Sequence, residues 1–307
     1  MVRIAFLGTP AVAVPALRAL ASAEPVQAVF CNPDRPVGRG RVLEAPPVKQ
    51  AGLDLGLPIH QPERWKHPET RALWEGLCID LAVVVAYGHL LPDWMLDSLP
   101  LGAWNLHFSL LPRWRGAAPV NHAILAGDAE TGVSLMRITS GLDAGPVLAA
   151  FARPITLTDT ADALLAHLAE DAAALLTAHL ETLGNGTARP TPQVDRLATL
   201  APKLARDMSA LDPAQPAEAL HRRVRALQPW PGTEVRAFDT PIKVCGVGGI
   251  RTCGQTSGTL RWSKAGAWLT AGDGRALELT HLQRPGKPVQ PALQALQPWG
   301  AEGVTQV

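Results

Sequence analysis

The sequence lacks an excess of either charge, because 28 Lys and Arg residues stand against 27 Asp and Glu residues and the formal net charge is +1. No overall positive field therefore favours a polyanionic partner, and any contact with nucleic acid has to come from local basic segments. Charged residues make up 18% of the chain and hydrophobic residues 47%, a composition typical of globular proteins with a sizeable core.

Paired cysteines are also lacking, since none of the four cysteines has a second one at C-x-x-C spacing. A chain of 307 residues with this much apolar material needs no disulfide bonds, so we expect reduced thiols in a reducing compartment. No cluster of Cys and His has metal-ligand spacing, and we expect no metal. The absence of a G-x-G-x-x-G motif after the first apolar run argues against a dinucleotide-binding module.

Long apolar runs are missing as well. No stretch approaches the roughly 18–20 uninterrupted apolar residues that a membrane-spanning helix needs. The apolar run at residues 4–7 turns into Gly8-Thr9-Pro10, which is too early for a signal peptide. We therefore expect a cytoplasmic protein that has no membrane partner. As a separate expectation, the protein acts as a monomer.

Strand-like and helix-like segments alternate over the first two-thirds of the chain. A β-branched run at residues 81–86 is typical of a central parallel strand that is covered on both faces. Apolar residues repeat with helical spacing over residues 160–183, and Gly184 ends the pattern. The alternation predicts βαβ units and a parallel sheet in an α/β domain over residues 1–186. The other expected strands are 4–7, 26–30, 103–106 and 133–138.

The composition changes after this domain. Residues 187–202 contain three prolines and little periodicity, so we expect an extended linker over 187–206. Short strand-like runs between Gly-rich turns then predict a small β-barrel or sandwich over 207–307. This second domain is mildly basic, with 11 Lys or Arg residues against 8 Asp or Glu residues.

Two polar residues lie at the end of the strand expected over 103–106. Asn105 and His107 are two positions apart, so both side chains point to the same side of an extended chain. Ligands of open α/β sheets gather at the carboxyl ends of the strands, where an amide donor beside an imidazole suits a reaction centre. An Asn that ends a strand and a hydrogen-bonded loop His would have the same spacing, and the pattern alone leaves both interpretations open.

A carboxylate in a later loop is a candidate partner for this pair. Asp143 lies between Gly141 and Gly145, and such a residue is often only a turn former. If its carboxylate reaches His107, it orients the imidazole and favours the charged form. Since no Ser or Cys nucleophile accompanies the three residues, we expect direct transfer to an attacking group that the substrate supplies.

Several motifs, in the same order, resemble the methionyl-tRNA formyltransferase family. Residues 105–119 (NLHFSLLPRWRGAAP) resemble the family's active-site segment, and residues 141–145 (GLDAG) resemble its second active-site loop. The resemblance covers nearly the whole chain and weakens after about residue 235. The further matches are FLGTP at 6–10, NPDRPVGRGR at 32–41, VVVAYG at 83–88, AGDAETGV at 126–133 and VRALQPWPG at 224–232.

The resemblance implies that a formyl group passes from 10-formyltetrahydrofolate to the amino group of methionyl initiator tRNA. It implies a Rossmann-like formyltransferase domain and a smaller OB-like β-barrel domain that binds tRNA. Asn105 and protonated His107 would donate to the formyl oxygen, and Asp143 would hold His107 in its charged form. The folate-binding residues that it implies are Ser109, Leu110, Leu111, Pro112, Val85, Ala86, Tyr87 and Gly88.

The resemblance also assigns the tRNA contacts. Arg39 and Arg41 lie in the loop 34–41, which without it is as readily interpreted as a solvated loop. We expect the second domain to add phosphate contacts that make binding sensitive to salt. The candidate residues for these contacts are Arg222, Arg223, Arg225 and Lys243.

The chain departs from the family pattern at two places. Phe108 stands where the family usually has a small residue, and residues 211–213 stand where it often has a tryptophan after the acid. The main alternative is another user of 10-formyltetrahydrofolate, a formyltransferase or deformylase acting on a small molecule or on water, because these enzymes share the Asn, His and Asp. A non-catalytic RNA-binding protein would not require those three residues together.

Overall fold

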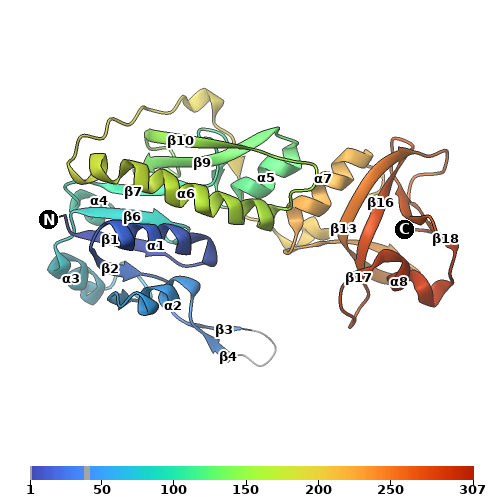
Figure 1. The fold of residues 1–307 in the computed structure, drawn as a ribbon, viewed down its shortest axis with the longest axis horizontal. Helices are drawn as coiled ribbons and strands as arrows, with labels where there is room; N and C mark the ends of the chain where they lie inside the picture. Colours follow the sequence, from blue (N-terminus) through green and yellow to red (C-terminus); the bar gives the residue numbers. More distant parts are fainter. Residues whose placement is uncertain (1, 38–41) are drawn as a thin grey trace. The chain divides into compact units, whose positions relative to one another are not determined.

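The computed structural model describes residues 2–37 and 42–307, which form two compact units (Figure 1). The first unit comprises Met1–Pro119, Glu130–Pro154 and Leu165–Ala201. The second unit comprises Val120–Ala129, Ile155–Leu164 and Pro202–Val307. Within the described ranges, no helix combines the length and apolar content that crossing a membrane requires.

The first unit is built on a seven-stranded sheet with the order β10-β9-β7-β6-β1-β2-β5. The five strands from β5 to β7 are parallel, while β9 is antiparallel to β7 and β10 is antiparallel to β9. The parallel sheet expected from the sequence is therefore confirmed. The strands are β1 (Ile4–Gly8), β2 (Val26–Phe30), β5 (Ile59–His60), β6 (Leu81–Val85), β7 (Ala103–His107), β9 (Glu130–Arg137) and β10 (Val147–Pro154).

Helices cover this sheet because its central strands are apolar on both faces. All five residues of β1 and all five of β6 are buried, and the two strands pair from Ile4 opposite Leu81 to Gly8 opposite Val85. Trp74 and Met95 cover one face, and Figure 1 shows α1 and α6 lying across the sheet. The helices of this unit are α1 (Val14–Ala23), α2 (Pro47–Asp54), α3 (Pro68–Leu77), α4 (Asp93–Asp97) and most of α6 (Ala161–Gly184), with a short 3-10 helix at Ala11–Ala13. Helix α5 (Pro119–Ala126) belongs to the second unit from Val120 onward.

A hairpin of β3 (Arg35–Val37) and β4 (Val42–Glu44) leaves the sheet after β2, with Arg35 opposite Glu44. Arg39 and Arg41, the two expected tRNA contacts, lie outside the described residues.

The stretch that follows α6 belongs to the first unit as far as Ala201. It contains a 3-10 helix at Asp195–Leu197 and the short strand β11 (Leu200–Ala201). β11 pairs in parallel with β8 (Arg115–Gly116), which lies in the segment after His107. The residues that we expected to form an extended linker thus pair with the region of the candidate site.

The second unit carries one curved antiparallel sheet with the order β12-β13-β16-β15-β14-β18, and β17 pairs with β16. Three register shifts bend the long strand β13, and such a half-barrel agrees with the barrel-like second domain expected from the sequence. The strands are β12 (Thr233–Ala237), β13 (Thr240–Thr252), β14 (Thr259–Ser263), β15 (Gly266–Thr270), β16 (Arg275–Gln283), β17 (Gln290–Pro291) and β18 (Gly303–Gln306). The helices are α7 (Ala217–Leu227) and α8 (Ala292–Leu296), with 3-10 turns at Arg206–Ser209 and Gln297–Trp299.

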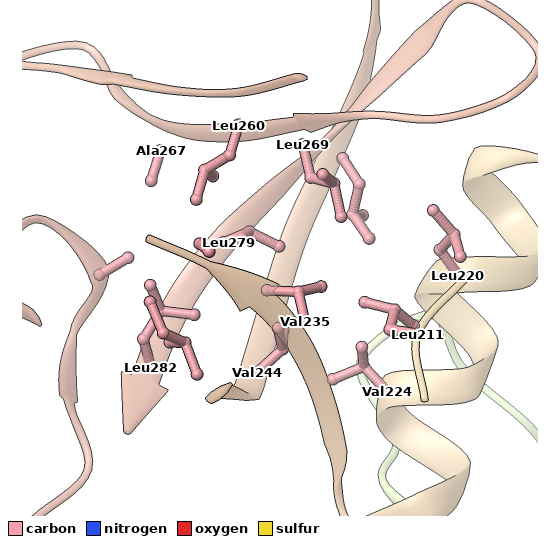
Figure 2. Packing of buried hydrophobic residues seen from close by; sticks show 14 of the residues in the cluster. Leu211, Leu220, Val224, Val235, Val244, Leu260, Ala267, Leu269, Leu279 and Leu282 are labelled. Atoms are coloured by element: carbon pink, nitrogen blue, oxygen red, sulfur yellow. The ribbon is translucent and has the colours of Figure 1, made fainter. Parts of the chain in front are cut away.

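The core of the second unit lies between this sheet and α7. Figure 2 shows Leu220 and Val224 of the helix pointing toward the side chains of the strands. Val244, Leu269 and Leu279 of the strands belong to the same cluster, and all are almost completely buried. Apolar side chains on alternate strand positions thus form a continuous core, as expected for a sheet with one face against a helix.

Candidate active site

Asn105 and His107 lie at the carboxyl end of β7, between β6 and β9. Asn105 pairs with Val84 and Met136, and His107 pairs with Ser134. His107 is 6% exposed and Asn105 is half-buried. Among the described residues no hydrogen-bond partner is recorded for the Asn105 amide, so its donors are available to a bound molecule.

The imidazole of His107 is held by a backbone carbonyl. Its Nε2 lies 2.9 Å from the carbonyl oxygen of Trp114, and because a carbonyl only accepts, Nε2 carries a proton. Nδ1 is therefore the nitrogen that remains for chemistry. The sequence offered no sign of this contact, which depends on a left-handed backbone conformation at Trp114, where φ is 65°.

Asp143 completes the group of three that the sequence predicted. Its Oδ2 lies 3.6 Å from His107 Nδ1 and accepts a hydrogen bond of 2.8 Å from the backbone N–H of Gly116. A separation of 3.6 Å is too long for a direct hydrogen bond. The carboxylate and Nδ1 therefore face each other across a gap in which they can share or exchange a proton with a substrate group.

Strained backbone brings these groups together. Trp114 has a φ of 65° and Asp143 a φ of 46°, in the region that favours glycine, at a cost of about 1–3 kcal/mol for each residue. Gly116, with a φ of 123°, satisfies a different constraint, since a Cβ there would lie 2.6 Å from the carbonyl oxygen of Ala201. Only glycine permits this close approach of β11 to β8.

The segment after His107 is fixed from within. Ser109 is fully buried, and its hydroxyl donates to the carbonyl of Arg113 over 2.6 Å. Ser134 on β9 donates to the carbonyl of Ser109 and accepts from the N–H of Leu111. The Ser109 hydroxyl is thus committed to the loop. The half-buried residues Leu110, Leu111 and Pro112 are the part of this expected folate segment that presents apolar surface.

The second expected folate segment follows β6, the neighbour of β7. Val85 is buried, while Ala86 and Gly88 are exposed with φ values of 48° and 83°. Tyr87 is 2% exposed, and burial raises the pKa of its hydroxyl above the ordinary value. Because Val84 pairs with Asn105, the backbone at 86–88 leaves the sheet beside the candidate reaction centre.

The arginines of the predicted site have different roles. The Arg113 guanidinium lies 4.3 Å from the centre of the Trp114 ring, a cation–π contact. Arg115 donates to Gln193 and, at 2.8 Å, to Asp195, so it holds the stretch after α6. Neither role was predicted for these two residues. Within the described residues, no group of three or more His, Cys, Asp or Glu side chains could hold a metal.

One of the expected phosphate contacts of the second unit is wrong. Arg225 is 6% exposed and donates to the carbonyls of Thr156 and Asp159 over 3.0 and 2.7 Å. Its guanidinium is therefore not at the surface. Arg222 and Arg223 are half-buried and Lys243 is exposed, so these three remain candidates.

Two contacts near the site escaped the sequence analysis. Gln193 donates to the carbonyls of Asp143 and Gly145, and Thr199 accepts from the N–H of Trp114. These residues are 50 and 85 positions away from Asp143 and Trp114, so no local pattern could connect them.

Comparisons with known proteins agree with this architecture. The formyl transferase family model matches residues 2–180, and the model of the formyl transferase C-terminal domain matches residues 203–298. A methionyl-tRNA formyltransferase of Halorhodospira halophila is 48% identical over 301 residues, 96% of this chain and 95% of the relative. One of Xylella fastidiosa is 46% identical over 288 residues, 92% of this chain and 93% of the relative.

Solved structures share the fold at low identity. The N-formyltransferase of Helicobacter canadensis, in complex with folinic acid and dTDP-3-aminofucose, aligns with a TM-score of 0.69 and 16% identity over 91% of this chain and 99% of its own. The phosphoribosylglycinamide formyltransferase of Streptococcus pneumoniae aligns with a TM-score of 0.51 and 24% identity over 60% of this chain and 99% of its own. These similarities concern the arrangement of the chain and not the substrate.

Proposed function

The chain belongs to the methionyl-tRNA formyltransferase family, and from this premise we propose that Asn105, His107 and Asp143 transfer the formyl group of 10-formyltetrahydrofolate to the amino group of methionyl initiator tRNA. The observation that carries the assignment is the amide of Asn105, which has no recorded partner in the described part of the chain and lies on the same strand end as His107, the partner of Asp143.

Asn105 Nδ2 donates a hydrogen bond to the formyl oxygen as the amine attacks the formyl carbon and negative charge develops on that oxygen. A donor of this kind stabilises a transition state by about 2.7–4 kcal/mol. His107 Nδ1 donates a second hydrogen bond when it carries a proton. Nε2 cannot take this part while it donates to the carbonyl of Trp114.

His107 and Asp143 handle the proton that the amine loses. The pair accepts this proton as the new C–N bond forms, and releases it to N10 of the folate as the bond between the formyl carbon and N10 breaks. One C–N bond forms and one breaks, and the proton that leaves the amine ends on the departing nitrogen. The enzyme forms no covalent intermediate in this scheme, because the hydroxyls of the nearby Ser109 and Ser134 both donate to backbone carbonyls.

The folate fits the edge of the sheet between β6 and β7. Leu110, Leu111 and Pro112 offer an apolar wall for its aromatic parts, and the exposed backbone at Ala86 and Gly88 offers hydrogen-bonding groups for the pterin edge. The Ser109 hydroxyl is already used within the loop, and Tyr87 is buried, so these two residues support the site from beneath.

The tRNA is held by basic segments outside this centre. We assign Arg39 and Arg41 to the acceptor end of the tRNA, and residues 207–307 to its phosphates, after the linker 187–206 that follows the catalytic domain 1–186. We further propose that the protein acts as a monomer. Methionyl initiator tRNA is made where translation takes place, which supports a cytoplasmic location.

The decisive experiment is transfer of radiolabelled formyl from 10-formyltetrahydrofolate to methionyl initiator tRNA, with methionyl elongator tRNA as the matched acceptor. We expect label on the initiator at a rate well above that on the elongator. Label on free amino sugars or glycinamide ribonucleotide, or release of formate, at a higher rate than on the initiator would refute the assigned acceptor.

A further inference from the structure

We propose that Gln193 and Thr199 are positioning residues, which hold Asp143 and Trp114 in the left-handed conformations that bring the carboxylate and the imidazole together. Both lie in the stretch between α6 and β11, which the sequence marked only as a linker. The inference rests on the roles proposed above for Asp143 and His107.

Gln193 uses its whole amide to fix the Asp143 loop. Its Nε2 donates to the carbonyls of Asp143 and Gly145, over 2.8 and 2.7 Å. Its Oε1 accepts from Nε and Nη2 of Arg115, over 3.0 and 2.8 Å. The two carbonyls flank Ala144, so one side chain determines the path of the backbone on both sides of that residue.

These contacts and one further hydrogen bond hold both the backbone and the carboxylate of Asp143. Arg115 precedes Gly116, whose N–H donates to Asp143 Oδ2 over 2.8 Å. The carbonyl of Asp143 is thus held by Gln193, and its carboxylate is held by the backbone next to the arginine that Gln193 binds. The backbone and the side chain of Asp143 are therefore both held in position relative to β8, and this fixes the direction of the carboxylate.

Thr199 does the same for the carbonyl that holds the imidazole. Its Oγ1 accepts from the N–H of Trp114 over 2.9 Å, and its own carbonyl accepts from the N–H of Arg115 over 2.9 Å. Both peptide groups that flank Trp114 are therefore anchored. The Trp114 carbonyl lies between these anchors and accepts from His107 Nε2.

This bracing has a physical reason. Left-handed conformations of residues other than glycine persist only where the surroundings determine them more than once. Without Gln193 or Thr199, the loops can relax toward ordinary backbone angles, which moves the groups that face each other at 3.6 Å. A misplacement of about 1 Å in a reaction centre can lower the rate about 100-fold.

The test is Gln193→Glu, which preserves the shape and the contact with Arg115 but removes both N–H donors. We expect kcat for methionyl-tRNA to fall about 100-fold, with KM for both substrates and binding of 5-formyltetrahydrofolate changed by less than about threefold. Gln27→Glu is the matched control, because Gln27 is exposed on β2, which is separated from β7 in the same sheet by β1 and β6. It should leave kcat and the melting temperature unchanged.

A double-mutant cycle separates positioning from general stability. In an Asp143→Asn background, adding Gln193→Glu should cost less than about threefold in kcat, because residues that act as a unit are not additive. Thr199→Val should lower kcat, while Thr199→Ser, which keeps the hydroxyl, should restore it. Full additivity with Asp143→Asn, or a loss confined to KM or to the melting temperature, would overturn the inference. If Asp143→Asn itself left kcat unchanged, the proposed catalytic role would fail instead.

Discussion

The two seven-stranded sheets of this chain use unusual backbone conformations in different ways. In the second unit, Phe238 and Asp239 have φ values of 53° and 55° and form the two-residue turn between β12 and β13. Two adjacent residues with left-handed backbone conformations are usual in a tight two-residue hairpin turn. At the carboxyl edge of the parallel sheet, Ala86, Trp114 and Asp143 have the same conformation, each in a different segment of the candidate site.

The difference lies in what holds the strain. The hairpin turn is held by the pairing of its own two strands, from Ala237 opposite Thr240 onward. Trp114 and Asp143 are held by side chains from far along the chain. In the first unit, backbone strain that distant residues maintain positions the groups of the candidate site. In the hairpin, backbone strain that the adjacent strands maintain only reverses the direction of the chain. The predictions below test this distinction.

The largest effect should come from removing the amide of Asn105, for which no hydrogen-bond partner is recorded within residues 2–37 and 42–307. Asn105→Ala should lower kcat by about 100- to 1,000-fold, because a donor to the developing oxyanion is lost. The melting temperature should stay close to that of the parent, since the amide has no partner among the described residues to lose. Steady-state formylation kinetics and thermal unfolding measure the two quantities.

Asn185→Ala is the control for this change. Asn185 accepts hydrogen bonds from Thr187 in the surface turn after α6, away from the strand ends. Its loss should leave kcat unaltered. A rate for Asn105→Ala within a few-fold of the parent would remove the assigned role.

A truncation in the second sheet should have the opposite profile. Leu279 is 2% exposed in the core of that unit, and Leu279→Ala should lower the free energy of unfolding by about 2–5 kcal/mol. Folate binding should be unaffected in the part of the protein that remains folded. Leu157 is 79% exposed, and Leu157→Ala should change stability by no more than about 0.5 kcal/mol. Equal effects of the two substitutions in urea unfolding would contradict this account of the core.

A smaller effect concerns pH. His221 is buried on α7, and burial, helped by Arg225 and Arg222 and opposed by Glu218, lowers the pKa of its imidazole. Its Nδ1 accepts from Arg225 Nε over 3.2 Å, which only the neutral ring can do.

The direction of the effect follows from this lowered pKa. The unfolded state binds a proton near the ordinary pKa of about 6.5, while the folded state resists it. The contribution of His221 to stability is therefore present above that pH and is lost as the pH falls toward the folded pKa. The free energy of unfolding should fall between pH 7.5 and about 5, and His221→Gln should reduce this slope. The exposed His167 is the control, and an unchanged slope in His221→Gln would contradict the argument.

The sequence predicted the parts of the fold that depend on local pattern. The β-branched run expected as a strand over 81–86 is β6, and the helix expected over 160–183 is α6, because continuous burial and helical spacing are visible in the residues themselves. In the second domain, the sequence predicts Gly-rich turns between short strands. One such Gly-rich stretch lies instead within β13, where its glycines accompany bulges in the pairing with β16.

The site divides in the same way. Asn105, His107 and Asp143 could be named from motifs, and the structure brings His107 and Asp143 together. The tautomer of His107 could not be predicted, because it depends on the left-handed backbone conformation of Trp114. A tryptophan in the sequence gives no sign of that conformation. The burial of Arg225 was equally hidden, because its partners lie 66 and 69 residues away.

The smallest effect is expected for Asp239→Gly, and the same substitution at Asp143 provides the contrast. Asp239→Gly should raise the free energy of unfolding by up to about 1 kcal/mol, because a tight hairpin turn favours glycine at φ of 55° and the structure assigns this side chain no hydrogen bond among the described residues. Asp143→Gly should relieve similar strain, yet it removes the carboxylate that faces His107 and should lower kcat by about 100-fold or more. Urea unfolding and formylation kinetics on both variants measure this contrast. If Asp239→Gly destabilised the second unit, or Asp143→Gly kept its activity, the proposed difference between the hairpin turn and the candidate site would be wrong. The left-handed residues of the two sheets would then respond alike.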